Sequence, residues 1–372
     1  MDDQIPQTLI EEDLGACDPA EAGMNPDKLA EVAAFAEANE TTATRDLAEG
    51  LASVLAVREP APWNEVIGPT KPRGEPNGLV LRGGRMVAEW GDVDRVDMTF
   101  SATKSYLAIV AGLAVADGLI RDVDDPVAGY ALDDRFETEQ NRSITWRHLL
   151  HQTSEWEGTL WDKPDLVDRN RQVGVGSDNS QKGTHRDLQR PGTFFEYNDV
   201  RVNLLALSLM EVFRRPLPEV LKERVMDPIG ASDGWQWHGY ENSYVEIDGQ
   251  RLQSVSGGAH WGGGLWISSR DHARVGQLIL NRGSWGGREI LPESWIEEMI
   301  APSACNPGYG YLWWLNRNGE QSPEAPASSV FALGAGYNAI CVVPNHDIVT
   351  VVRWITQDKV GELLGLVLAG LE

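Results

Sequence analysis

The stretch from Ser105 to Ala116 is apolar on nearly every face of the helix that its spacing predicts. Leu107, Val110 and Leu113 recur at helical intervals, and small apolar residues fill most positions between them. A helix that is apolar all round belongs in the interior of a protein rather than on its surface. We therefore expect this helix to be buried, with the rest of the chain folded around it.

The sequence Ser101-Ala-Thr-Lys104 stands at the start of this helix. The spacing places the hydroxyl and the ammonium on one helix face, about a turn apart. An adjacent amine and the unpaired N–H groups of a first turn can make a serine nucleophilic. The alternative is that Ser101 caps the helix and Lys104 is solvated. Because the helix dipole disfavours a cation in the first turn, the position of Lys104 favours the nucleophile.

Composition narrows the classes of partner. The 372 residues carry a formal net charge of −24, which argues against nucleic acid or an anionic membrane as partner.

Cys17, Cys305 and Cys341 are far apart and odd in number, so we expect no disulfide framework and no metal site, and no cofactor is indicated. The first residues lack the pattern of a signal peptide, and no segment has the length and apolarity of a membrane span. The expected location is cytoplasmic.

The order of the predicted elements indicates an α+β fold. We expect a strand hairpin over residues 78–91, helices in the middle of the chain, and several strands after residue 307. This order predicts one antiparallel sheet built from both ends of the chain. It suggests a mixed α/β domain from residues 1–100 and 251–372 and a mainly helical domain from residues 101–250. Further expected elements are helices over 26–39, 146–151, 198–213, 271–281 and 359–371, with an irregular excursion over 43–76.

Two further motifs carry potential chemistry. Tyr197 precedes a predicted helix start at Asn198 and Asp199, where the helix dipole and a neighbouring cation favour a phenolate that can act as a general base. The alternative is that these residues only cap the helix. Gly334 and Gly336 fit an edge strand that a substrate approaches closely, or else a bulge or turn.

Together, Ser101-x-x-Lys104, Tyr197-Asn-Asp199 and Gly334-Ala-Gly336 resemble the three motifs of serine β-lactamase-fold enzymes. The nearest branch is the class C β-lactamase-like esterases, or family VIII carboxylesterases, and the resemblance covers about residues 20–370. It implies an antiparallel sheet of about five to nine strands flanked by helices, an all-helical domain, and an active site between them. It also implies that Ser101 is the nucleophile and that Lys104 and Tyr197 together act as the general base. The N–H groups of Ser101 and Tyr337 would form the oxyanion hole.

The chain departs from this pattern at two positions. The usual cation of the third motif is replaced by Gly334, which weakens the case for β-lactams because that cation binds the substrate carboxylate. The second motif ends in Asp199 rather than Asn. An aspartate near Lys104 would keep the lysine protonated and shift the role of base towards Tyr197.

The remaining residues bear on the substrate. There are 14 tryptophans, and we expect Trp156 and Trp261 to help line an apolar pocket, with Asp199, Gly334 and Gly336 also contacting substrate. Glu157 and Asp162 are expected near the mouth, where they would repel anions; the histidines, including His260, are read as structural or rim residues.

The expected activity is that of a serine carboxylesterase acting on a small ester with an apolar part. The open alternatives are an amide hydrolase (a β-lactamase, a D-aminopeptidase or a linear-amide hydrolase of the nylon-oligomer kind), an acyltransferase, and a non-catalytic binding protein.

Overall fold

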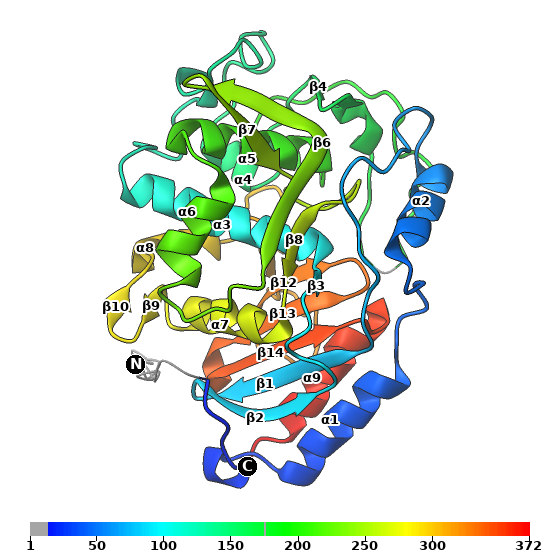
Figure 1. The fold of residues 1–372 in the computed structure, drawn as a ribbon, viewed down its shortest axis with the longest axis vertical. Coiled ribbons are helices and arrows are strands. Elements are labelled where there is room, and N and C mark those ends of the chain that lie inside the picture. The colour runs from blue at the N-terminus through cyan, green and yellow to red at the C-terminus, as the bar shows by residue number, and fades with distance from the viewer. Residues whose placement is uncertain (1–13, 175) are drawn as a thin grey trace.

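A computed structural model describes residues 14–174 and 176–372, and it is built around a six-stranded antiparallel sheet (Figure 1). The strand order is β11-β12-β13-β14-β1-β2, so the sheet joins strands from both ends of the chain, as the sequence predicts. The strands are β1 (Asn77–Arg82), β2 (Arg85–Trp90), β11 (Trp314–Leu315), β12 (Val330–Gly334), β13 (Asn338–Val343) and β14 (Ile348–Arg353). The expected lack of a signal peptide concerns the first residues of the chain, which lie outside the described part.

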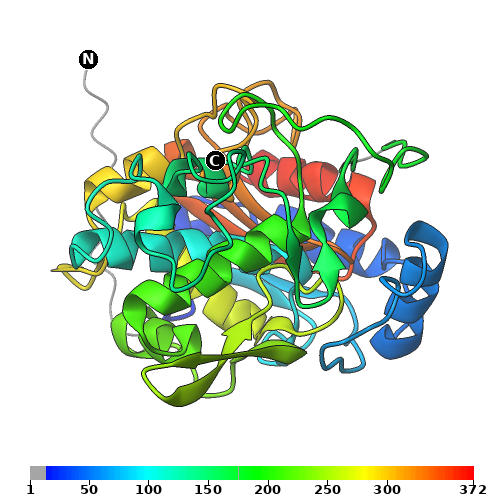
Figure 2. The same cartoon turned by 90° about the horizontal axis from the view of Figure 1, so that it is seen from above.

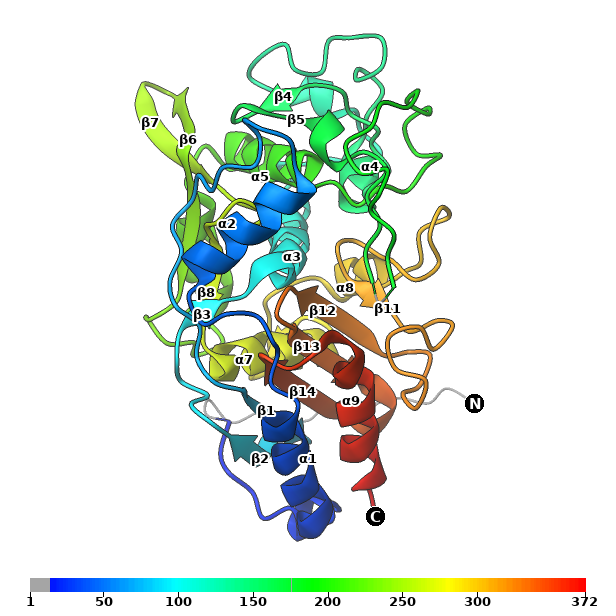
Figure 3. The same cartoon turned by 90° about the vertical axis from the view of Figure 1, so that its right-hand side faces the viewer.

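Helices cover both faces of this sheet (Figure 3). Successive residues of a strand point to opposite faces, so Val80 packs with α1 (Pro26–Ala38) and α9 (Val360–Ala369), whereas Leu79 and Leu81 pack into the main core on the other side. On that second side, α7 (Ser269–Leu280) lies against β14, β13 and β1. The expected hairpin and the expected helices near both ends of the chain are therefore confirmed.

The rest of the chain packs around α3 (Thr103–Ala116), in which every residue from Thr103 to Ala114 is buried. This burial is what its all-round apolar sequence predicts. Further α-helices are α4 (Trp146–Leu150), α5 (Asp199–Phe213), α6 (Leu217–Leu221) and α8 (Glu293–Met299). Two pairs of short strands also form: β4 (Thr159–Leu160) with β5 (Lys163–Pro164), and β9 (Ser284–Trp285) with β10 (Arg288–Glu289). The domain boundaries suggested above stay a prediction.

Two regions differ from the expectation. Residues 43–76 are not irregular throughout, because α2 (Leu47–Arg58) forms there and lies at the edge of the molecule (Figure 2). The Asp46 side chain caps it by accepting hydrogen bonds from the Ala48 and Glu49 N–H groups. The second difference is another antiparallel sheet of order β3-β8-β6-β7, where the sequence indicated helices and loops up to residue 250. Its strands are β3 (Asp97–Met98), β6 (Gln236–Ile247), β7 (Gln250–Val255) and β8 (Gly264–Ile267).

Among the described residues, the helices fall short of the length and apolarity needed to cross a bilayer.

Candidate active site

Ser101 lies in the short 3-10 turn Phe100–Ala102, just ahead of α3, and lines a cavity of about 1070 Å³. The Lys104 Nζ atom donates a hydrogen bond to Ser101 Oγ at 2.9 Å. Lys104 is only 1% exposed, and no side chain caps α3, so the alternative of a capping serine with a solvated lysine does not describe this structure. Phe100 has φ of +48°, a left-handed conformation that strains a non-glycine residue and fixes the backbone entering Ser101.

The positive charge of Lys104 is balanced by the carboxylate of Asp199, the first residue of α5. The Lys104 Nζ to Asp199 Oδ1 distance is 2.5 Å, and both side chains are 1% exposed. Burial raises the pKa of the Asp199 carboxyl, but the charges of Lys104 and Arg171 outweigh burial and hold this pKa well below its usual range. The helix cap is Asn198, whose side chain accepts from two backbone N–H groups, so the Asp199 carboxylate is left for the lysine.

Tyr197 also lines the cavity, and its ring lies between aromatic residues and cations. It stacks on Trp314 with a centroid distance of 5.7 Å. The Lys104 Nζ atom lies 4.7 Å from the centre of the Tyr197 ring. Among the described residues, none hydrogen-bonds to the phenol oxygen, and such bonds often form only once substrate is bound. The structure therefore brings Ser101, Lys104 and Tyr197 together, with Lys104 in contact with both partners.

The turn between β12 and β13 also forms part of the cavity wall, with Gly334, Gly336 and Tyr337 among the lining residues. A Cβ atom at Gly334 would lie 2.0 Å from the Thr99 carbonyl oxygen, so the space beside this glycine is filled by the chain that leads into Ser101. A side chain at Gly334 would therefore meet the protein's own backbone, while the predicted contact of Gly334 with substrate stays a prediction. Tyr337, the proposed oxyanion donor, has φ of +47°.

The predicted tryptophans do not lie in the cavity wall. Trp156 is 2% exposed, and its indole N–H donates to the Arg135 carbonyl oxygen. Trp261 is fully buried, and its indole N–H donates to Glu59. Both side chains fill the core, and the described aromatic residues that do line the cavity are Tyr197, Trp314, Phe331 and Tyr337.

The acidic residues near the mouth are also different from those expected. Glu157 pairs with Arg169, Asp162 accepts from Asn242, and neither lines the cavity. Four other exposed acidic residues do so, and we call them the acidic rim: Glu320, Glu324, Asp358 and Glu362.

Four further charged residues, which the sequence analysis did not single out, lie around Lys104 and Asp199: Glu59, Asp168, Arg171 and Lys182. We call these four, together with Lys104 and Asp199, the charged wall. Arg171 pairs with Asp199 and with Asp168, and the Asp168 carboxylate also accepts from the Asp199 backbone N–H at 2.8 Å. Burial raises the pKa of Asp168, but the nearby cations lower it by more, so the pKa of this carboxyl lies well below its usual range.

One group of described residues offers metal-ligating atoms close together. Atoms of Glu59, Asp168 and His260 lie within 4.8 Å of one another. The Lys182 Nζ atom lies 3.1 Å from an oxygen of each of the two carboxylates, and it also donates to the Val167 carbonyl oxygen. The Lys182 ammonium thus occupies the position between these two carboxylates. His260 contacts Glu59 through Nε2 and lines the cavity, which fits the expectation of a rim residue.

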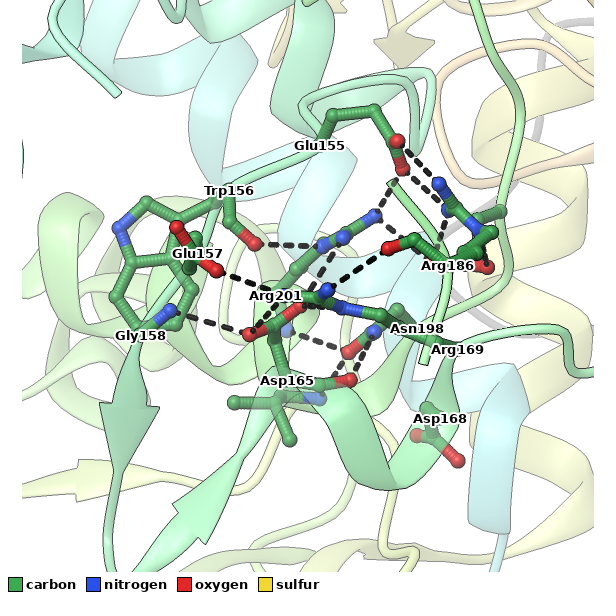
Figure 4. Close-up of polar contacts among 12 residues, drawn as sticks. Glu155, Trp156, Glu157, Gly158, Asp165, Asp168, Arg169, Arg186, Asn198 and Arg201 are labelled. Carbon is green, nitrogen blue, oxygen red and sulfur yellow. Dashed lines mark hydrogen bonds and ion pairs between the residues drawn. The ribbon is translucent and has the colours of Figure 1, made fainter. Parts of the chain in front are cut away.

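A buried ion-pair network fixes the segment that carries Asp168 and Arg171 (Figure 4). Arg201 of α5 donates to Glu155 at 2.8 Å and to Asp165 at 3.2 Å. Arg169 donates to the same Asp165 carboxylate, and the Asn198 side chain donates to the Asp165 carbonyl oxygen. Removing one member would leave a buried charge unpaired, so the network holds this segment against the start of α5.

The comparisons with known proteins agree with this geometry. The family model described as Beta-lactamase matches residues 79–362. The chain belongs to the beta-lactamase family. Its fold is that of β-lactamases and penicillin-binding proteins, which confirms the predicted fold class. The curated proteins contain no match to the chain.

Three solved structures illustrate the likeness of fold. A penicillin-binding protein homologue from Caulobacter crescentus has a TM-score of 0.61 at 16% identity, covering 94% of this chain and 99% of that one. EstCE1, described as a hydrolase with promiscuous acyltransferase activity, has a TM-score of 0.56 at 15% identity, with coverages of 93% and 99%. An octameric penicillin-binding protein homologue from Pyrococcus abyssi has a TM-score of 0.53 at 18% identity, with coverages of 80% and 72%.

Proposed function

We propose that this beta-lactamase-family chain is a serine hydrolase that cleaves carboxylic esters through an acyl-enzyme. The observation that carries the proposal is the hydrogen bond from buried Lys104 to Ser101, in a cavity that Tyr197 also lines. A serine bonded to a cation and close to a possible base is the arrangement that nucleophilic catalysis needs.

The proposed chemistry assigns a separate role to each group. The Lys104 ammonium, paired with Asp199, donates to Ser101 Oγ and so stabilises negative charge on it, whereas the Tyr197 phenolate takes the serine proton. Ser101 Oγ then bonds to the substrate carbonyl carbon, and the oxyanion is stabilised by the N–H groups of Ser101 and Tyr337. As the carbon–oxygen bond breaks, Tyr197 returns the proton to the leaving alcohol. Water then attacks the acyl carbon while Tyr197 takes its proton. The bond from this carbon to Ser101 Oγ breaks, Tyr197 returns the proton to Ser101, and the acid leaves.

The lining of the cavity supports an ester with an apolar acyl or alcohol part. Apolar residues form much of its wall: Val173, Trp314, Phe331, Leu333 and Val360. The absence of a side chain at Gly334 and the negative charge of the acidic rim both disfavour a substrate carboxylate. Penicillin-like substrates, which carry a carboxylate, are therefore disfavoured relative to neutral esters.

The acidic rim also favours a second candidate, an amide hydrolase for substrates that carry an amine. Its four exposed carboxylates could attract an ammonium group to the cavity mouth. This candidate uses the same nucleophile and base.

A substrate panel separates these candidates. Wild type and Ser101→Ala are assayed with p-nitrophenyl butyrate, nitrocefin and D-alanine p-nitroanilide. The ester proposal predicts rapid, Ser101-dependent hydrolysis of the butyrate and little turnover of the other two. Faster turnover of the anilide would favour the amide hydrolase, and hydrolysis of the butyrate that Ser101→Ala retains would refute a serine acyl-enzyme.

A further inference from the structure

Arg171 is a charged residue of the cavity that the chemistry above does not use. It lies in the loop that follows the 3-10 turn Asp165–Asp168, and its side chain is 15% exposed and lines the cavity. The centre of its guanidinium lies 5.2 Å from the centre of the Tyr197 ring. Tyr197 is thus approached by two cations, Lys104 from α3 and Arg171 from this loop.

Asp199 holds both cations at once. Its Oδ1 accepts from Lys104 and its Oδ2 accepts from Arg171, and the His260 Nδ1 atom lies 3.4 Å from the same Oδ2. An asparagine has only one side-chain oxygen, and its NH2 group would face a donor. The aspartate that distinguishes this chain's second motif is therefore the residue that can seat Arg171 beside Tyr197. Asp168 completes the seat, at 3.2 Å from Arg171 Nη1.

The third motif usually carries a cation at the position of Gly334, but no side chain fits at this position in this chain. A Cβ atom there would lie 2.0 Å from the Thr99 carbonyl oxygen and 3.1 Å from the Ala102 nitrogen. These are backbone atoms next to Ser101, so they cannot move aside without displacing the nucleophile. A second positive charge near the nucleophile and Tyr197, besides Lys104, therefore has to come from another element, and Arg171 lies over the Tyr197 ring in position to supply it.

We propose that Arg171 is a positioning residue for the general base: its guanidinium, held by Asp168 and Asp199, favours the phenolate form of Tyr197. The inference rests on the proposed function of Tyr197 as base. An adjacent positive charge stabilises a phenolate, whose proton-accepting oxygen then takes the Ser101 proton. In the described part of the chain, the other charged or titratable groups around Tyr197 and its neighbouring ion pairs are Lys104, Asp199, His260, Tyr309 and Tyr337.

The pH dependence of kcat/KM tests this role. Arg171→Gln removes the charge, so less of Tyr197 is phenolate at a given pH, and the acid limb of the profile moves to higher pH by about one unit or more. Arg171→Lys keeps the charge and should leave the limb near its wild-type position. The matched control is Arg135→Gln, which removes an arginine of similar exposure (11%) that pairs with Asp133 and Glu211 instead and lies outside the network that holds Arg171. This control can lower stability but should not move the acid limb.

A second readout separates this inference from the proposed function. The rate at which a fluorophosphonate labels Ser101 is measured against pH in wild type and in Arg171→Gln, with Arg171→Met as the neutral variant if the glutamine does not fold. Failure of wild type to be labelled at Ser101 would overturn the proposed function itself. Labelling of wild type, with an acid limb that stays in place in the neutral variants, would overturn only the role of Arg171.

Discussion

The two sides of the cavity differ in how their charges are held. On the charged wall, the carboxylates of Glu59, Asp168 and Asp199 are buried and each is paired with a cation. In the acidic rim all four carboxylates are exposed, and in the described part of the chain neither Glu324 nor Asp358 has a hydrogen-bond partner. The difference teaches that one side can fix the catalytic groups in place, whereas the other can only attract or repel what enters.

The largest effect is expected on breaking the charged wall at Asp199. Asp199→Asn leaves Lys104 and Arg171 sharing a neutral partner in a buried place, which should cost about 3–5 kcal/mol in the free energy of unfolding. Because Lys104 and Arg171 then lose their shared carboxylate, the pH–rate profile should change shape as well. Urea unfolding and kcat/KM against pH measure the two effects.

The matched control for this variant is Asp248→Asn, which removes an aspartate from an exposed pair with Arg214. It should change neither stability nor activity appreciably, because exposed pairs contribute little. A pH–rate profile of Asp199→Asn identical to that of wild type would contradict the role given to Asp199.

A smaller effect is expected from crowding the same ion pair. A Cβ atom at Gly258 would lie 2.1 Å from Asp199 Oδ1 and 2.2 Å from Lys104 Nζ. Gly258→Ala should therefore separate the pair, destabilise the protein by about 1–3 kcal/mol and lower kcat more than it raises KM. Gly129→Ala, at a glycine with open space around it and no positive φ, is a control for the loss of a glycine. Equal effects of the two alanines on kcat would argue against the importance of the pair.

The charged wall should also make stability depend on acid pH. The pKa values of Asp168 and Asp199 are lower in the folded than in the unfolded chain, so the unfolded chain takes up protons first as the pH falls. Their contribution is complete above about pH 4 and is lost progressively below it. Urea unfolding of wild type and Asp199→Asn at pH 7, 4 and 3 should show the two stabilities converging as the pH falls. A constant difference between them would contradict this sign.

The smallest effect is expected at the acidic rim. The double variant Glu320→Gln, Glu324→Gln should leave stability and kcat unchanged, because both side chains are exposed. Its KM for an anionic ester should fall, and its KM for an amine-bearing substrate should rise, each by about two- to fivefold. Unchanged KM values for both would mean that the rim does not select substrates.

Local sequence patterns predicted the parts of the site that lie within one element. The apolar run after Lys104 predicts a buried helix, and the polar start of α5 predicts a cap at Asn198 or Asp199, of which Asn198 is the one found. The helix α2 carried a usable signal that was overlooked, since Asp46 followed by Glu49 is a common helix start.

Long-range contacts could not be predicted in this way. Arg171 and Asp199 are 28 residues apart, and Glu59 and Trp261 are 202 apart, so no spacing in the sequence indicates that they meet. The same limit explains the error at Trp156 and Trp261. An indole can line a cavity or fill a core, and only the position of a distant acceptor for its N–H decides between the two.

The most direct test is to trap the covalent intermediate on Ser101. Wild type, Ser101→Ala and Tyr197→Phe are treated with a fluorophosphonate, and the adduct is located by intact-mass and peptide mass spectrometry. The account predicts one adduct on Ser101 in wild type, slower labelling in Tyr197→Phe and none in Ser101→Ala. An adduct on a different residue, or labelling of wild type and Tyr197→Phe at the same rate across the pH range, would contradict it.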